Sequence, residues 1–233
     1  MNILLTGASR GIGAATLELL ASTGHVVAGH STKGGDGLIP GDLANPLSAR
    51  GIWQAALDRL GGRIDVLVNN AGIYEGVGDD ASDPDWQAAW SRTLQVNLES
   101  PASLCRLAVQ HFREAGGGRI INVASRAAYR GDSPSHWHYA ASKSALIGMT
   151  KTIARGYAAD NILAFAVAPG FTVSEMTEDY LAGRGGAQIV ADIPLGRVTN
   201  TAEVAEAIRW LAIDAPAAST GSVIDLNGAS YVR

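Results

Sequence analysis

Short apolar runs alternate with longer amphipathic segments along the whole chain. The apolar runs are nearly continuous rather than alternating with polar residues, which is typical of strands buried on both faces. They predict strands over residues 2–7, 25–30, 65–72, 119–125, 162–170 and 222–228.

The segments between these runs have the spacing of amphipathic helices. Asn200 followed three residues later by Glu203 predicts an N-cap with its reciprocal partner. Alternation of strand and helix predicts an α/β fold, a parallel sheet covered by helices on both faces. Ligands of such sheets bind beyond the carboxyl ends of the strands. The predicted helices span residues 11–23, 48–60, 103–115, 139–158 and 201–212.

Composition narrows the classes of function. The chain has 233 residues, 47% of them hydrophobic, and a net charge of −4 with no block of Lys or Arg. Binding to nucleic acid or to an anionic membrane therefore has no electrostatic support. No apolar run approaches the roughly 18 residues of a membrane span, and a strand begins at residue 2, so we expect a cytoplasmic protein without a targeting peptide. We find no domain boundary and expect one domain over residues 1–233.

Cys105 is the single cysteine, which excludes an intramolecular disulfide and a cysteine-rich metal site. Its apolar surroundings predict a buried small side chain. His136 and His138 have a spacing that metal ligands can have, but no further ligand cluster supports them, so we expect no metal.

A glycine-rich turn joins the first strand to the first helix. Gly7, Gly11 and Gly13 can adopt backbone angles and close approaches that other residues cannot. The helix N-terminus offers free N–H groups and partial positive charge to a pyrophosphate. In this strand–turn–helix context the turn predicts a dinucleotide site.

The spacing "TGASRGIG" resembles the short-chain dehydrogenase/reductase family, and further motifs follow in order. "NNAG" at 69–72, "QVNLES" at 95–100, "INVAS" at 121–125, "YAASK" at 139–143 and "APG" at 168–170 resemble family motifs. The resemblance covers some 220 residues and implies a Rossmann-type, doubly wound parallel sheet of about seven strands.

The resemblance also implies the site residues. The catalytic set is Asn97, Ser125, Tyr139 and Lys143. The cofactor-binding set is Gly7, Ser9, Arg10, Gly11, Ile12, Gly13, His30, Ser31, Thr32, Lys33, Asp42, Leu43, Asn70, Ala71, Gly72, Tyr139, Lys143, Pro169, Gly170, Thr172 and Ser174.

These residue types suit carbonyl reduction, which needs a hydride donor, a proton for the alkoxide and hydrogen bonds to hold it. Tyr139 and Lys143 share one helix face. The lysine charge and the positive nicotinamide of the oxidised cofactor are expected to lower the phenol pKa from about 10. By the resemblance, Ser125 binds the substrate oxygen, Lys143 also holds the nicotinamide ribose, and Asn97 holds a water that links Lys143 to solvent.

The cofactor is expected to be NADP(H) rather than NAD(H). NAD-binding relatives have an acid at the end of the second strand, where this chain has His30 and Ser31. The first acid, Asp36, is better explained as a turn residue. Arg10, with Ser31, Thr32 and Lys33, is suited to a 2′-phosphate.

The chain also departs from the family. About seven residues separate His30 from Leu38, too few for a helical crossover, so a short loop is expected there. Asp42 either contacts the adenine edge or caps the next helix. Leu163 and Phe165 replace usual polar residues, and residues 227–229 read Asn-Gly-Ala instead of Asp-Gly-Gly.

Several aromatic and polar residues remain open to two interpretations. Thr172 and Ser174 are expected near the nicotinamide amide, although Thr172 can act through its backbone alone. Residues 136–138 either line the substrate mouth or only pack a loop. Trp86 and Trp90 are expected in the core or at a subunit interface.

The leading hypothesis is an NADP(H)-dependent reductase of a ketone or aldehyde, reversible toward alcohol oxidation. The resemblance leans toward 3-oxoacyl thioester reductases, and Arg126 or Arg130 near the site can meet an anionic carrier. The alternatives are an NAD-dependent dehydrogenase of a sugar, steroid or other secondary alcohol, and a non-catalytic dinucleotide-sensing regulator. Relatives commonly form tetramers, so a homo-oligomer, tetramer or dimer, is expected.

Overall fold

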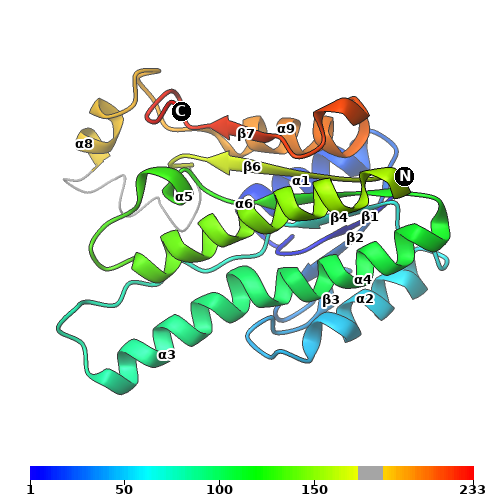
Figure 1. Cartoon of the computed structure of the whole chain (residues 1–233), viewed down its shortest axis with the longest axis horizontal. Coiled ribbons are helices and arrows are strands. Elements are labelled where there is room, and N and C mark those ends of the chain that lie inside the picture. Colours follow the sequence, from blue (N-terminus) through cyan, green and yellow to red (C-terminus); the bar gives the residue numbers. More distant parts are fainter. Residues whose placement is uncertain (173–185) are drawn as a thin grey trace.

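The computed structural model describes residues 1–172 and 186–233. A seven-stranded sheet runs through the centre in the order β3-β2-β1-β4-β5-β6-β7, and every neighbouring pair is parallel. Helices cover both faces (Figure 1). The predicted doubly wound parallel sheet is confirmed. The strands are β1 Asn2–Leu5, β2 Val26–Ser31, β3 Ile39–Pro40, β4 Val66–Asn69, β5 Gly118–Val123, β6 Ile162–Pro169 and β7 Val223–Leu226.

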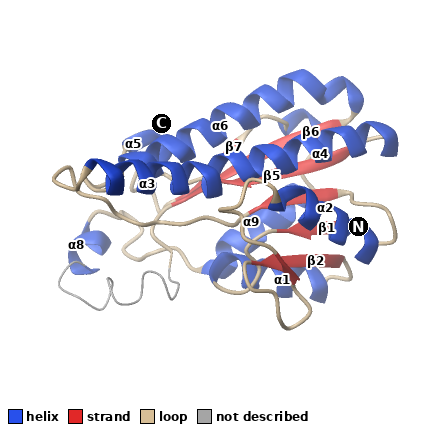
Figure 2. Cartoon of the chain, turned by 90° about the horizontal axis from the view of Figure 1, so that it is seen from below, coloured by secondary structure: helices blue, strands red, loops and turns tan. Residues whose placement is uncertain are grey.

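The helices lie where strands must be connected across a parallel sheet. In the view of Figure 2, which is turned by 90°, the helices lie on both sides of the strands. The described helices are α1 Gly11–Ser22, α2 Ser48–Arg59, α3 Asp83–Leu94, α4 Ser100–Ala115, α5 Ala127–Arg130, α6 Trp137–Tyr157, α8 Gly186–Ala191 and α9 Thr201–Ile213, with 3₁₀ turns η2 Ala158–Asp160 and η3 Ala217–Ser219 and a π-helix η1 Gln95–Glu99.

Two apolar layers form because successive strand residues point to opposite faces. Leu4, Leu67 and Ile120 pack with residues of α2 and α4 in one layer. On the other face, Leu5 and Val68 pack with residues of α9. The near-continuous apolar runs of the sequence therefore reflect strands with no solvent-exposed side.

The connection from β2 to β3 is a short loop over residues 32–38 without a helix, as expected. Gly34, Gly35, Asp36 and Gly37 all have positive φ, so the chain reverses direction within this loop. Asp36 is thus a turn residue. The shortened loop brings β3 beside β2 after only a few residues.

Other local expectations are also confirmed. Asn200 accepts a hydrogen bond from the Ala202 N–H at 2.7 Å, and Glu203 accepts one from the Asn200 N–H at 2.9 Å, which forms the capping box of α9. Leu163 and Phe165 are buried core residues of β6, and Cys105 is buried in α4. No described helix is long and apolar enough to cross a membrane.

A strained alanine follows β7. Gly228 and Ala229 have φ of 62° and 66°, the left-handed region. A side chain there costs roughly 1–2 kcal/mol, whereas glycine adopts this conformation freely. At position 229 the chain therefore has alanine, with its methyl group, in a backbone conformation that favours glycine.

Replacing Ala229 with Gly should stabilise the fold by about 0.5–1 kcal/mol. The relief of strain exceeds the extra freedom of the unfolded chain, which is worth about 0.4–1 kcal/mol. Chemical denaturation of the two proteins measures the difference in their free energies of unfolding. Ala88→Gly, at an exposed position of α3, is the control and should destabilise the fold by about 1 kcal/mol. If both substitutions changed the free energy of unfolding in the same direction, the strain assigned to Ala229 would be contradicted.

Candidate active site

The turn between β1 and α1 packs so closely against the segment after β4 that Gly7 and Gly13 have no room for a side chain. A Cβ at Gly7 would lie 2.8 Å from the Cα of Ala71, and one at Gly13 only 1.9 Å from the Gly7 carbonyl oxygen. Gly7 and Gly11 also have positive φ of 68° and 55°. These three positions therefore require glycine for reasons of space or backbone angle.

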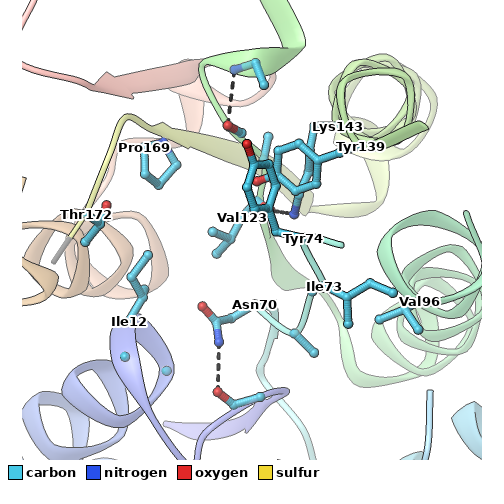
Figure 3. Close-up of a pocket in the computed structure, with 18 of the residues that line it drawn as sticks. Ile12, Asn70, Ile73, Tyr74, Val96, Val123, Tyr139, Lys143, Pro169 and Thr172 are labelled. Carbon is cyan, nitrogen blue, oxygen red and sulfur yellow. Dashed lines mark hydrogen bonds between the residues drawn. The ribbon is translucent and has the colours of Figure 1, made fainter. Parts of the chain in front are cut away.

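Side chains of β1 and β4 hold this turn. The Thr6 hydroxyl accepts hydrogen bonds from the N–H groups of Asn70 at 3.0 Å and Ala71 at 3.1 Å. The Asn70 side chain donates to the carbonyls of Thr6 and Gly7, both at 3.0 Å. The "NNAG" segment thus fixes the shape of the glycine turn, and Figure 3 shows Asn70 in this position.

The N-terminus of α1 opens into the resulting cavity. Arg10 occupies the N-cap without a side-chain capping hydrogen bond, and the first turn carries no acidic residue. The N–H groups of this turn are therefore available to an anion, and the helix dipole favours one. This arrangement fits the pyrophosphate of a dinucleotide.

The His30 side chain, on β2, contacts both the glycine turn after β1 and the segment after β3. Its Nε2 lies 2.8 Å from the Gly41 carbonyl oxygen, and its Nδ1 accepts a hydrogen bond from the Gly7 N–H at 3.4 Å. A neutral ring with hydrogen on Nε2 satisfies both contacts. Burial lowers the pKa of His30, and the Gly41 hydrogen bond raises it to a lesser extent.

The predicted residues at the adenosine end divide into two groups. Ser31, Thr32, Asp42 and Leu43 line the cavity, whereas Lys33 is exposed and is not among its lining residues. The Ser31 hydroxyl accepts the Gly34 N–H at 3.0 Å, and Asp42 accepts the Ala44 N–H at 2.9 Å. Both side chains therefore also stabilise local turns. Since α2 begins at Ser48, Asp42 is not the N-cap of that helix.

Tyr139 and Lys143, near the start of α6, lie beside Val123 at the end of β5 (Figure 3). The Lys143 ammonium donates to the Val123 carbonyl at 2.8 Å and lies 5.7 Å from the centre of the Tyr139 ring. The Ser125 hydroxyl accepts the Ala127 N–H at 3.1 Å and hydrogen-bonds Tyr139. The strand end and the helix start therefore bring together a phenol, a hydroxyl and an ammonium group.

Burial dominates the titration of the tyrosine–lysine pair. It raises the pKa of Tyr139 to about 12, although the hydrogen bond with Ser125 lowers it, and it lowers the pKa of Lys143 to about 8. In the protein alone, desolvation by burial is the largest influence on this phenol and raises its pKa. The expected lowering depends on the charges of Lys143 and of an oxidised nicotinamide, and it stays a prediction. The phenol is accordingly a proton donor at neutral pH.

Asn97 lies in the π-helix η1 between α3 and α4. Its Oδ1 accepts the Ile73 N–H at 2.9 Å, and its Nδ2 donates to the Ile73 carbonyl at 3.0 Å and to the Ser142 hydroxyl at 3.3 Å. It therefore ties the segment after β4 to α6, which carries Tyr139 and Lys143. π-Helical turns are rare and frequent at functional sites, and nothing in the sequence indicated this one.

These elements enclose a cavity of about 790 Å³ at the carboxyl ends of the strands. This volume is within the usual range for ligand pockets. Ser125, Tyr139, Lys143 and most of the predicted cofactor residues line it. Ser174 lies outside the described residues. The predicted residues that line the cavity at the cofactor positions are Gly7, Ser9, Arg10, Gly11, Ile12, Gly13, His30, Ser31, Thr32, Asp42, Leu43, Asn70, Ala71, Gly72, Pro169, Gly170 and Thr172.

The structure adds a substrate-side wall that sequence reasoning missed. Tyr74 lies edge-on to Tyr139 at 4.8 Å between ring centres and stacks on His136 at 3.9 Å. Its hydroxyl donates to Asp132 at 2.9 Å. His136 therefore supports this wall from behind, and residues 136–138 are not among those that line the cavity. The only signal for Tyr74 was its position two residues after "NNAG".

Relatives of known name match the chain over nearly its full length. A family model described as enoyl-(acyl-carrier-protein) reductase matches residues 7–228. Nodulation protein G of Rhizobium meliloti is 39% identical over 97% of this chain and 94% of its own length. The 3-oxoacyl-(acyl-carrier-protein) reductase of Vibrio cholerae is 34% identical over 98% of this chain and 96% of its own.

Solved structures agree with these matches. A short-chain dehydrogenase/reductase mutant from Serratia marcescens has a TM-score of 0.89 and 30% identity, with 99% of this chain and 97% of that one covered. A 3-ketoacyl-(acyl-carrier-protein) reductase from Brucella melitensis, solved in complex with NADH, has a TM-score of 0.85 and 25% identity over 99% and 98% of the two chains.

Fold, site and matches together define an NAD(P)-dependent oxidoreductase. The chain belongs to the short-chain dehydrogenase/reductase family.

The fold should lose stability below pH 6.5 in a way that depends on His30. Because its pKa is lowered in the folded chain, the unfolded chain takes up the proton first, so this contribution is present above pH 6.5 and is lost as the pH falls. One proton gives at most about 1.4 kcal/mol per pH unit. His30→Gln keeps a donor for Gly41 and removes the titration.

Denaturant unfolding of wild type and His30→Gln between pH 5 and 8 measures this effect. The difference in unfolding free energy should shrink as the pH falls below 6.5. A difference that does not change with pH would contradict the proposed neutral ring.

Proposed function

We propose that the protein is an NADP(H)-dependent reductase that converts a ketone or aldehyde to an alcohol, reversibly. The observation that carries the proposal is that Tyr139 and Ser125 border the same cavity as the glycine turn. A dinucleotide held by that turn would share one cavity with these two hydroxyls. A sensor that only bound the dinucleotide would have no need of them.

Each site residue then has a chemical task. A nicotinamide cofactor, when bound, would supply the hydride for the carbonyl carbon and would itself be oxidised. As the carbonyl π bond breaks, Tyr139 donates its proton to the oxygen, and Ser125 stabilises the developing negative charge by a hydrogen bond. The raised pKa of Tyr139 keeps the phenol protonated until substrate arrives.

Lys143 and Asn97 act on the tyrosine and on the cofactor. Lys143 is anchored by the Val123 carbonyl, and the same ammonium group is suited to the hydroxyls of the nicotinamide ribose. A Cβ added at Gly72 would lie 3.3 Å from Asn97 Oδ1 and 3.4 Å from Lys143 Nζ. Both side chains therefore approach the Gly72 backbone from the same side, which supports a role for the pair in returning a proton to the site through water.

Replacing Tyr139 with Phe should remove carbonyl reduction and leave dinucleotide binding intact. The ring packing against Tyr74 is kept, and only the proton donor is lost, so kcat should fall by about 100-fold or more. Fluorescence titration with NADPH and assays with small ketones measure the two properties. Full activity in this variant would favour a role without catalysis by Tyr139.

The preference for NADP(H) has support in the local charges. Arg10 is exposed at the start of α1, and Ser31 and Thr32 border the same part of the cavity. The residues at the end of β2 are His30 and Ser31, so no carboxylate stands there to bind ribose hydroxyls or repel a phosphate. A 2′-phosphate with roughly two charges suits an arginine.

Wild type should bind NADPH more tightly than NADH at the same salt concentration, and Arg10→Ala should weaken NADPH binding by about 10-fold or more. NADH binding should change little, because NADH has no phosphate for Arg10 to contact. Binding titrations of both cofactors to both proteins measure this. Equal losses for the two cofactors would contradict a role in phosphate recognition.

The names of the relatives make 3-oxoacyl thioesters the first substrates to test. Nodulation protein G and the 3-oxoacyl-(acyl-carrier-protein) reductase cover nearly the whole chain. An NAD-dependent dehydrogenase of a secondary alcohol remains the alternative enzyme, and the cofactor titration distinguishes the two.

We also propose a cytoplasmic homo-oligomer formed through the faces of α3 and α6. Trp86 lies edge-on to Trp137 at 5.3 Å and beside Trp90 at 6.0 Å, and Trp137 is 53% exposed. Trp86 and Trp90 are only partly buried and are thus not core residues. Exposed aromatic groups of this kind are enriched at interfaces. Static light scattering gives the mass of the assembly.

A further inference from the structure

A buried arginine follows the serine of the active site. The Arg126 N–H donates to the Pro169 carbonyl at 2.9 Å, which fixes the residue between the ends of β5 and β6. Its side chain is only 11% exposed, yet it lines the large cavity. The Arg126 guanidinium therefore forms part of the cavity wall, next in sequence to Ser125.

The guanidinium group is held in place by its neighbours. It lies over the ring of Phe171 at 4.8 Å, and its Nη1 donates to the Ser230 hydroxyl. A guanidinium has five N–H donors, and within residues 1–172 and 186–233 this is its one side-chain hydrogen bond. Several donors are thus left for a group inside the cavity.

Both carboxylates near Arg126 are engaged elsewhere. Asp192 is 3.9 Å away and is held by Arg130 at 2.7 Å. Asp132 accepts the Tyr74 hydroxyl at 2.9 Å and the Ser133 N–H at 2.7 Å. The buried arginine therefore has no carboxylate within direct hydrogen-bonding distance among the described residues.

This environment is costly for a cation. Burial and the neighbouring charge of Arg130 lower the pKa of Arg126, and a buried charge normally requires a close partner. A carboxylate is a group that a fixed guanidinium can bind with two parallel hydrogen bonds. The site is preorganised for such a group, since Phe171 and Ser230 already hold the cation.

We propose that Arg126 binds a carboxylate on the substrate itself, so that the preferred substrate is a free oxo acid. This inference rests on the proposed function, because the carbonyl is reduced at Tyr139 and Ser125 while the carboxylate pairs with Arg126. An ester or thioester of the same acid is neutral at that position and gains nothing from the arginine.

The test compares matched acids and ethyl esters with NADPH. The pairs are pyruvate, acetoacetate and levulinate with their esters, which place the carboxylate at increasing distance from the carbonyl. Wild type should prefer the acid in at least one pair, and Arg126→Gln should reduce that preference by about 10-fold to 100-fold. Reduction of the esters should change much less.

Two further variants should change the preference for the acid over its ester in opposite directions. Asp192→Asn removes the carboxylate that competes for Arg126 and should increase the preference for the acid. Arg130→Gln releases Asp192 toward Arg126 and should decrease it. Arg113→Gln is the surface control, because Arg113 pairs with Asp160 at 2.8 Å on the exposed end of α4; it should leave the preference unchanged.

The outcomes separate this inference from the proposed function. Ester reduction without any preference for an acid would overturn the inference and leave the reductase intact. Equal losses for acid and ester in Arg126→Gln would also overturn it, since Arg126 would then only tie the start of α5 to Ser230 after β7. Failure to reduce any carbonyl compound would instead count against the proposed function.

An inhibition experiment on the wild-type protein tests the same inference without any variant, and therefore still applies if Arg126→Gln fails to fold. Butyrate should compete with ethyl acetoacetate for reduction, whereas butyramide, of similar shape but neutral, should compete at least about 10-fold more weakly. Equal inhibition by the two compounds would overturn the inference. Where no ester is reduced, thermal stabilisation of the NADPH complex by butyrate and not by butyramide gives the same distinction.

Discussion

The close packing of the glycine turn against the end of β4 is the constraint on which the site depends. Gly13 lies so near the Gly7 carbonyl that even a methyl group would overlap it, and Thr6 and Asn70 bind the two segments together. This packing directs the N-terminus of α1 into the cavity. A dinucleotide then finds free N–H groups and the positive end of a helix dipole at one end of a cleft that the parallel strands create.

A second set of contacts aligns the proposed catalytic groups with that cleft. Lys143 reaches from α6 to the carbonyl of Val123 at the end of β5, and Asn97 joins the chain after β4 to the same helix. The phenol of Tyr139 is thereby fixed relative to the strand ends and not only to its own helix. The proposed carbonyl reduction depends on this alignment, because the proton donor and the hydride donor must approach one carbonyl group from fixed positions.

The sequence predicted the features that depend on local pattern. Apolar runs identified the long strands, and the glycine spacing and the Tyr139–Lys143 pair indicated the two ends of the cavity. Features that arise from tertiary contacts were not predictable. The π-helix at Asn97, the Tyr74–His136 stack and the surroundings of Arg126 each join segments distant in sequence. Burial raises the pKa of the Tyr139 phenol in the protein alone, and the degree of burial cannot be judged from a four-residue spacing.

Transfer of deuterium from NADPH labelled at C4 of the nicotinamide tests the central claim most directly. The purified protein is incubated with each labelled C4 epimer and a panel of small oxo acids and their esters, and the alcohols are analysed by mass spectrometry. The account predicts deuterium on the carbinol carbon from one epimer only, because the turn and the Tyr139–Ser125 pair hold cofactor and carbonyl in one orientation. Oxidation of NADPH without deuterium in the alcohol, or no alcohol from any carbonyl compound, would contradict it.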